Sequence, residues 1–525
     1  MKLVDRILNL PLWMVVFSVF VYALGIRCYY QTQKENLSMD ELTNISIVCD
    51  SGEGWTKPYD SHRVYRGCEL RTMLYEDGNS WQEVKHDLSK LWRDNKDHTH
   101  ASLYYMILRV CYGTTHNLQT YIFTAFLFNL ACFVVAFFSL FLLLKAALGK
   151  HKWWIAFGLI TLFWNTYSIN TTLYLREYQM SIALYSLLML FVYHLLVHIR
   201  EGRDNHSSAI GYYFSLSLFM ALVLSSGYLN FFYVGFCGLL LLYFAVKKRQ
   251  YTICLYLFLS ALGALLLCLF MYPGFFLILQ DKSGSFSSQD SVMNLIAGDH
   301  ILSNLKMKLW HFFLVYGREL VYFICFPLLA GLYIGLMRHK WRTFFKSSSF
   351  SLLLFTNFIA SIVSFYLAPW ADGLYLATST AIVPLLLLYF FTKIDSTRWR
   401  RGGLLFIGIY YLVMSLCESN IYNLNKNWSY REWMSEEKPV VIASHRWEPY
   451  FLIPYFRDNQ KVIITTSPEE CKQLLSNIHE DVYLFDAFKK KYNTPVLNNQ
   501  LLLKFKVIRS CNYTEWFEGF ELHKR

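Results

Sequence analysis

Long apolar runs without a charged residue recur along most of this sequence, and they decide what the chain can fold into. A helical run of about 18 or more such residues is long enough to cross the roughly 30 Å of hydrocarbon in a bilayer. Of the 525 residues, 55% are hydrophobic and only 16% are charged, which leaves too little polar surface to cover a soluble core. The sequence therefore predicts an α-helical polytopic membrane protein.

About eleven runs qualify as candidate spans. They cover residues 10–29, 118–145, 152–171, 178–199, 209–227, 229–246, 251–275, 319–337, 349–369, 373–392 and 402–419. Alternate connections between them are rich in Lys and Arg, so by the positive-inside rule these connections and the amino terminus face the cytoplasm. The formal net charge of +12 is then orientation charge, and we expect the lipid bilayer, not nucleic acid, as a partner.

The composition changes after the last run. Short β-branched or apolar stretches at 440–444, 462–466 and 482–485 alternate with helix-compatible stretches such as 468–478, which is typical of an α/β fold. We expect residues 1–419 to form a transmembrane domain and residues 420–525 a small soluble α/β domain outside the cytoplasm. The pairs Cys49 with Cys68 and Cys471 with Cys511 lie in outward segments, where disulfides could form.

The outward loop at residues 31–117 carries two groups of titratable residues, one near each end. Asp40 and Glu41 follow the first span, whereas Asp97, His98 and His100 precede the second. Both ends of the loop return to the same membrane surface, so the two groups are expected to lie where an amphiphilic substrate reaches them. Between them, apolar residues at helical spacing predict an amphipathic helix, either in the membrane interface or packed on the loop: Trp81, Val84, Leu88, Leu91 and Trp92. A second interfacial helix is predicted at 302–316.

Each of these groups also has a purely structural interpretation. Ser38 precedes a short helical stretch, so Asp40 and Glu41 could simply begin a helix. The histidines and carboxylates of this loop could bind a divalent metal, but none of the loop's histidines shows the HxxxH or HExxH spacing that is typical of a dedicated metal site. Arg176 and Glu177 stand at an outward membrane boundary, where they either anchor a span or present a cation to a lipid phosphate.

The order of these motifs resembles the GT-C superfamily of polyprenyl-phosphate-sugar glycosyltransferases. The resemblance is strongest to the branch with the protein O-mannosyltransferases and lipid A aminoarabinose transferases, which carry an Asp-Glu pair, an HPPLYY-like segment and an Arg-rich motif in this order. Here these are Asp40-Glu41, the segment 100–105 (HASLYY) and the segment 176–178 (REY). The chain departs from the family at 101–102, which are not Pro-Pro, at Gln179, where a second Arg is frequent, and before Tyr375, where an Arg is absent.

The resemblance implies transfer of a sugar from a polyprenyl phosphate to a hydroxyl of a glycan, lipid or protein, by inverting displacement at the periplasmic face of a bacterial inner membrane. It implies Asp40 as general base with Glu41 in support. The residues implied in substrate binding are Asp97, His98, His100, Tyr104, Tyr105, Arg176, Glu177 and Tyr375.

Two other classes of function compete with this one. A lipid-linked sugar flippase or transporter should carry ionisable or Gly/Pro-broken helices at mid-membrane, whereas the runs here are nearly free of charge. A glycan polymerase or ligase should place its essential residues in a large late loop, such as 276–318.

Overall fold

The chain forms two compact units in the computed structural model. The model describes residues 10–34, 37–49, 60, 63–76, 80–93, 102–114, 118–149, 151–202, 209–273, 301–316, 348–367, 377–378, 380–392, 397–421, 437–444, 448–512 and 517–525. The first unit comprises residues 1–32, 98–104 and 126–422, and the second comprises residues 33–97, 105–125 and 423–525.

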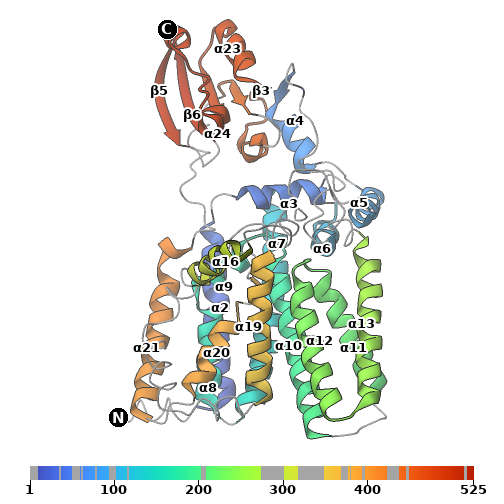
Figure 1. The fold of residues 1–525 in the computed structure, drawn as a ribbon. Helices are drawn as coiled ribbons and strands as arrows, with labels where there is room; N and C mark the ends of the chain where they lie inside the picture. Colours follow the sequence, from blue (N-terminus) through green and yellow to red (C-terminus); the bar gives the residue numbers. More distant parts are fainter. Residues whose placement is uncertain are drawn as a thin grey trace. The chain divides into compact units, whose positions relative to one another are not determined.

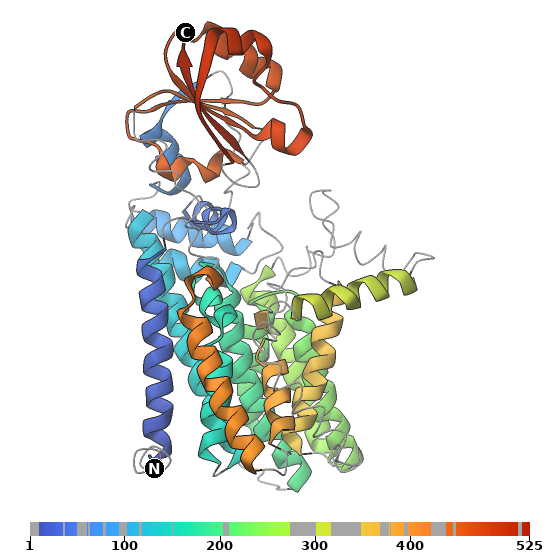
Figure 2. The same ribbon diagram turned by 90° about the vertical axis from the view of Figure 1, so that its left-hand side faces the viewer.

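The first unit is a bundle of helices that run side by side (Figure 1). In chain order these are α2 (Leu12–Thr32), α7 (Leu118–Leu148), α8 (Lys152–Phe163), α9 (Thr166–Leu173), α10 (Tyr178–Glu201), α11 (Ala209–Leu224), α12 (Asn230–Lys247), α13 (Tyr251–Met271), α16 (Ile301–Tyr316), α19 (Ser349–Leu367), α20 (Ile382–Phe391) and α21 (Thr397–Leu416). The helix α16 differs from the others because it lies across the ends of the bundle (Figure 2).

Six helices in the described part of the chain are long and apolar enough to cross a membrane: α2, α7, α10, α12, α13 and the part of α19 up to Tyr366. The chain is therefore an integral, multi-pass membrane protein, as predicted. The expected span at 319–337 lies outside the described residues.

The expected span at 152–171 is not one continuous helix. It is divided into α8 and α9, and Asn165 is the reason. The Asn165 side chain accepts a hydrogen bond from the Ser168 backbone N–H (2.7 Å) and donates to the carbonyls of Thr161 and Leu162 (both 2.8 Å). One amide thus caps the beginning of α9 and satisfies the last carbonyls of α8.

The second unit contains a six-stranded sheet in the order β1-β3-β2-β4-β6-β5. Its strands are β1 (Val64–Arg66), β2 (Val440–Ala443), β3 (Lys461–Thr465), β4 (Val482–Asp486), β5 (Phe505–Asn512) and β6 (Glu518–Lys524). The central strands β3, β2 and β4 are parallel, and the others join antiparallel. The three central strands coincide with the predicted β-branched or apolar stretches, and most of their residues are buried.

The helices of the second unit come from both the loop and the tail of the chain. Those of the loop are α3 (Met39–Cys49), α4 (Gly67–Arg71), a π-helix (Thr72–Glu76), α5 (Trp81–Arg93) and α6 (Ser102–Tyr112), whose first residues belong to the first unit. Those of the tail are α23 (Pro468–Asn477), α24 (Ala487–Tyr492) and α25 (Asn499–Lys504).

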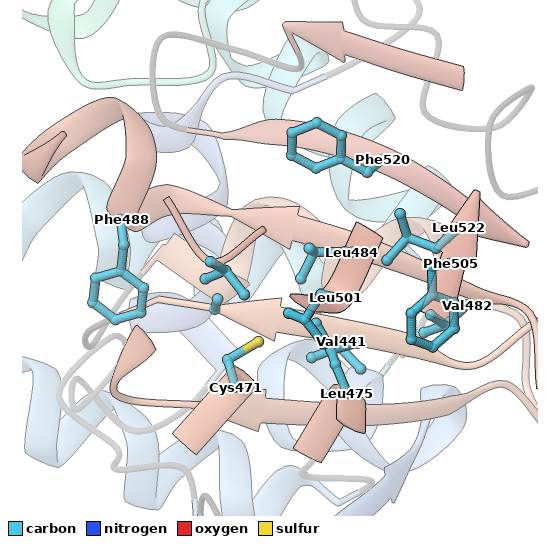
Figure 3. Packing of buried hydrophobic residues seen from close by; sticks show 12 residues of the cluster. Val441, Cys471, Leu475, Val482, Leu484, Phe488, Leu501, Phe505, Phe520 and Leu522 are labelled. Atoms are coloured by element: carbon cyan, nitrogen blue, oxygen red, sulfur yellow. The ribbon is translucent and has the colours of Figure 1, made fainter. Parts of the chain in front are cut away.

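The tail helices pack on the sheet around one apolar core (Figure 3). Val441, Leu484 and Leu522 of neighbouring strands share this core with Leu475 of α23. Cys471 lies in this core as a free thiol, and burial raises its pKa to about 12. Cys68 is also a free thiol. The two disulfides considered above, Cys49–Cys68 and Cys471–Cys511, are therefore not formed in this structure, and Cys471 serves as a packing residue.

The sheet also takes a strand from the loop that follows the first span. Strand β1 pairs with β3, with Val64 opposite Ile463 and Arg66 opposite Lys461. The chain then turns at Gly67, whose N–H donates to the Gln460 carbonyl (2.9 Å). A Cβ at residue 67 would lie 2.0 Å from the Arg457 carbonyl oxygen, so only glycine allows this approach.

Candidate active site

The candidate base Asp40 lies in the first turn of α3, and the sequence explains why the helix begins there. Ser38 and Glu41 form a capping box: the Ser38 N–H donates to Glu41 Oε2 (2.7 Å), and the Glu41 N–H donates to Ser38 Oγ (3.4 Å). This Ser-x-x-Glu pattern satisfies two backbone donors at the helix start. Asp40 is partly buried and follows Met39, the first helical residue, in the turn that the capping box fixes.

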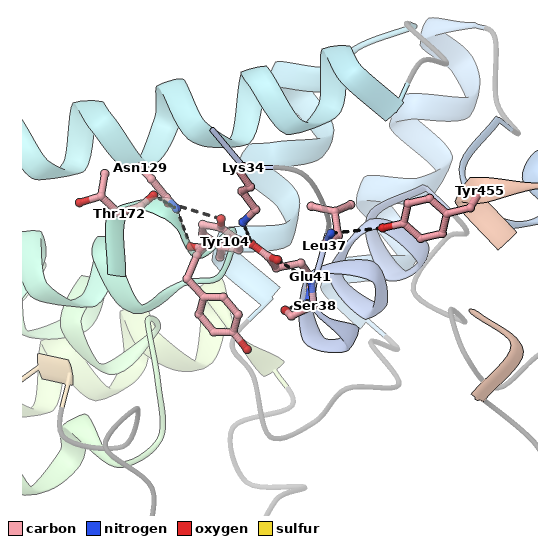
Figure 4. A network of polar contacts seen from close by, with 9 residues as sticks. Lys34, Leu37, Ser38, Glu41, Tyr104, Asn129, Thr172 and Tyr455 are labelled. Atoms are coloured by element: carbon pink, nitrogen blue, oxygen red, sulfur yellow. Dashed lines mark hydrogen bonds and ion pairs between the residues drawn. The ribbon is translucent and has the colours of Figure 1, made fainter. Parts of the chain in front are cut away.

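Glu41 has a second partner, because its Oε1 forms an ion pair with the Lys34 ammonium (Figure 4). The Glu41 side chain is 0% exposed and that of Lys34 is 2% exposed. Burial lowers the pKa of the Lys34 ammonium, and the charge and hydrogen bond of Glu41 oppose this effect. Glu41 thus links the start of α3 to the segment just after the first span, and this role favours support of Asp40 over direct chemistry.

A second buried ion pair holds the middle of the loop together. Arg109 of α6 donates from Nε to Asp87 Oδ2 of α5 (2.8 Å) and from Nη1 to the Gly113 carbonyl (2.6 Å). The helix α5 is the predicted amphipathic helix, with Val84 and Leu91 buried. The candidate Tyr105 of α6 is fully buried.

In the first unit, Asn129 of α7 organises the turn before α10. Its Nδ2 donates to the carbonyls of Thr172 (3.2 Å) and Tyr174 (2.8 Å), while its Oδ1 accepts from the candidate Tyr104 hydroxyl (3.4 Å) (Figure 4). Asn129 is fully buried and replaces the partners that the carbonyls lose where α9 ends. The path of the chain toward Arg176 is therefore set from α7.

The candidates Arg176 and Glu177 follow this turn. Both are 4% exposed, and Arg176 Nε lies 3.8 Å from Glu177 Oε2 as an ion pair. Glu177 is the N-cap residue of α10. Gln179, which departs from the family pattern, accepts hydrogen bonds at Oε1 from the hydroxyls of Thr171 (3.3 Å) and Thr172 (3.1 Å). It ties α10 to α9, a task for which a neutral amide is suited.

Two supporting residues, Asn129 and Arg27, were not predicted from the sequence. Asn129 is a polar residue within an otherwise apolar span, and such residues are usually functional or structural. Arg27 lies near the end of α2 and is completely buried. The sequence feature that could have indicated its role is the pair Ser168 and Thr172, two hydroxyl residues one helical turn apart that can both accept hydrogen bonds from one guanidinium.

The described residues do not include every candidate. Asp97, His98, His100 and Tyr375 lie outside them. Asp40, Glu41 and Tyr105 belong to the second unit, whereas Tyr104, Arg176 and Glu177 belong to the first. Within the described residues, no group of three His, Cys, Asp or Glu side chains is placed to hold a metal ion.

No protein-family model matches the sequence, and no curated protein matches it. Comparison with solved structures shows the fold, because two of them are similar to this chain over nearly its whole length. The particular structures are those of ArnT from Cupriavidus metallidurans, one bound to undecaprenyl phosphate and one in the apo state. Each has a TM-score of 0.51 at 12% identity and covers 97% of both chains. The archaeal oligosaccharyltransferase AglB from Archaeoglobus fulgidus, in complex with an inhibitory peptide and a dolichol-phosphate, gives a TM-score of 0.46 at 10% identity, over 90% of this chain and 70% of that one.

Proposed function

We propose that this protein is a membrane glycosyltransferase that moves a sugar from a polyprenyl-phosphate donor to an acceptor hydroxyl. The observation that carries the proposal is the likeness to ArnT over 97% of the chain, since one of the ArnT structures holds undecaprenyl phosphate. The order of Asp40, Tyr104 and Arg176 along the chain supports it. The proposal includes about eleven spans, an active site on the periplasmic face of a bacterial inner membrane, and an outward position for the tail domain of residues 420–525.

In the proposed reaction Asp40 is the general base of a single inverting displacement. Its carboxylate takes the proton of the acceptor hydroxyl as the acceptor oxygen attacks the anomeric carbon. The bond from that carbon to the phosphate oxygen breaks, and the polyprenyl phosphate leaves with the electron pair. Arg176 stabilises the charge that grows on this phosphate. Glu41 acts by holding the turn that carries Asp40, because both of its oxygens already have partners.

The direct test is Asp40→Asn in a purified membrane preparation. Mass spectrometry of the lipids that copurify with the unaltered protein identifies the donor, and release of polyprenyl phosphate from that donor is then followed with time. We expect Asp40→Asn to slow release by about 10²- to 10⁴-fold, the usual contribution of a general base, while donor binding is retained.

The matched control is Glu469→Gln. Glu469 occupies the same position of α23 that Asp40 occupies in α3, two residues after a serine that caps the helix. It should leave transfer unchanged. Near-normal release by the Asp40→Asn protein would remove Asp40 as the base, and essential residues within 276–318 would then favour a polymerase or ligase.

A further inference from the structure

The guanidinium of Arg27 is completely buried near the end of the first membrane span. It belongs to α2 and is 0% exposed. Its planar group lies 4.1 Å from the centroid of the Phe133 ring. A buried cation in this part of a membrane protein is costly, so its retention points to a function.

The contacts of Arg27 show what it holds. Nε donates to Thr172 Oγ1 (2.9 Å) and Nη2 donates to Ser168 Oγ (2.6 Å), both on α9. Nη1 donates to the carbonyls of Phe163 (3.0 Å) and Ala23 (2.7 Å). All four acceptors are uncharged oxygens, and three of them belong to α8 and α9. The group therefore works as a rigid fork of donors.

The same hydrogen-bond chain continues on both sides of Arg176. The Thr172 hydroxyl that accepts from Arg27 lies 3.1 Å from Gln179 Oε1 at the start of α10, and the Thr172 carbonyl accepts from Asn129. Thr172 precedes Arg176 and Gln179 follows it. Arg27 thus fixes the two ends of the turn that presents Arg176.

We propose that Arg27 is a positioning residue of the donor site, which acts on the polyprenyl phosphate through Arg176 and not by contact. This inference rests on the proposed function, because it assigns Arg27 to the phosphate site proposed there. It also assigns one role to Ser168, Thr172 and Gln179. Their hydrogen bonds connect Arg27 of α2 to the turn before α10 and so fix that turn relative to α2.

A double-mutant cycle tests the inference, with undecaprenyl phosphate alone as the probe. The dissociation constant is measured for the unaltered full-length protein, Arg27→Lys, Arg176→Gln and the double variant, and thermal unfolding is measured for each. Lysine keeps the charge but cannot form the fork. We expect Arg27→Lys to weaken binding roughly tenfold, and to add less than about twofold when Arg176 is already Gln, because coupled residues do not act additively. Thr172→Val, which removes one of the four acceptors of Arg27 and the hydrogen bond to Gln179, should give a smaller loss in the same direction.

The control is Asn357→Leu. Asn357 is also fully buried in the bundle, and it bonds Tyr185 of α10. The Asn357→Leu substitution should lower the unfolding temperature without changing the affinity for undecaprenyl phosphate. Additive losses in the cycle, or unchanged binding by a folded Arg27→Lys protein, would overturn the inference. Failure of the unaltered protein to bind the probe would instead contradict the proposed function itself.

Discussion

At the scale of single residues, Glu41 shows how a residue suggested for chemistry serves the structure. Its carboxylate caps α3 through Ser38 and neutralises Lys34, and both side chains are excluded from water. A buried ammonium needs a charged partner, since an uncompensated charge is far more costly than a broken pair at the surface. The orientation of Asp40 therefore depends on an ion pair to which Asp40 does not belong.

We predict that Glu41→Gln destabilises the loop by about 3–5 kcal/mol, the usual loss when one partner of a buried pair is removed. The double variant Lys34→Met with Glu41→Gln should recover most of this loss, because no buried charge is left. Hydrogen exchange of residues 38–49 and chemical unfolding in detergent measure both effects.

Glu83→Gln is the control for this prediction. Glu83 caps α5 with Ser80 in the same way (2.9 and 3.3 Å), but it is exposed. Its substitution should therefore lower the free energy of unfolding much less. Equal losses for Glu41→Gln and Glu83→Gln would show that the Lys34 pair contributes nothing beyond the cap.

The start of α3 could be predicted from the sequence, but its ion pair could not. A serine followed three residues later by glutamate is a local signal, and the short helix after it appears as expected. Lys34 lies before the helix, seven residues from Glu41, and no local pattern predicts that these two residues meet. The roles of Asn129 and Arg27 could not be predicted for the same reason, because they bind residues of other helices.

At the scale of elements, α16 is a helix with two different faces. Phe312 packs against Phe358 and Phe365 of α19, with ring centroids 6.2 and 5.5 Å apart. Met307, Trp310 and Leu314 are exposed at helical spacing, 51%, 64% and 46% respectively. The helix forms where it was expected, and a helix that lies across a membrane bundle with such a stripe is typical of the headgroup boundary of the bilayer. Its interfacial position stays a prediction.

We predict that a fluorescent label at Trp310→Cys is quenched by lipids that carry a spin label near the headgroup. The label should sit at that depth because the exposed apolar stripe is buried there in lipid. Leu503→Cys is the control: Leu503 is 74% exposed on α25 of the second unit. In lipid nanodiscs the label at 310 should be quenched and the label at 503 should not. Equal quenching at the two positions would mean that α16 does not contact the bilayer.

Apolar runs predicted where most helices lie but not where they break. The run at 152–171 has the composition of one span, yet Asn165 divides it, because the amide satisfies backbone groups on both sides of the break. The apolar composition of a run indicates how favourable its transfer into lipid is. It does not indicate whether one side chain within the run competes for backbone hydrogen bonds.

At the scale of the whole molecule, the sequence predicted a helical membrane part and an α/β tail, but not the strand that the loop adds to the tail sheet. Strands β2, β3 and β4 are short, mostly apolar and mostly buried, so their pattern is strong. Strand β1 has only three residues at an edge, and its existence depends on a partner far along the chain.

We predict that Gly67→Ala loosens this union of loop and sheet, because the new Cβ would meet a backbone oxygen that has no room to move. Overpacking of this kind costs about 1–3 kcal/mol. Hydrogen exchange of residues 63–76 should increase and the unfolding temperature should fall. The control is Gly25→Ala in α2, where a Cβ meets nothing within 4 Å. Unchanged exchange at 63–76 would show that β1 tolerates the shift.

The pairing of Arg66 with Lys461 also imposes an order on biosynthesis. A growing chain whose ribosome has not yet translated β3 already contains Asp40 but has no edge on which β1 can form. Residues 64–66 of the loop that carries the proposed base therefore cannot reach their final pairing until β3 has been synthesised.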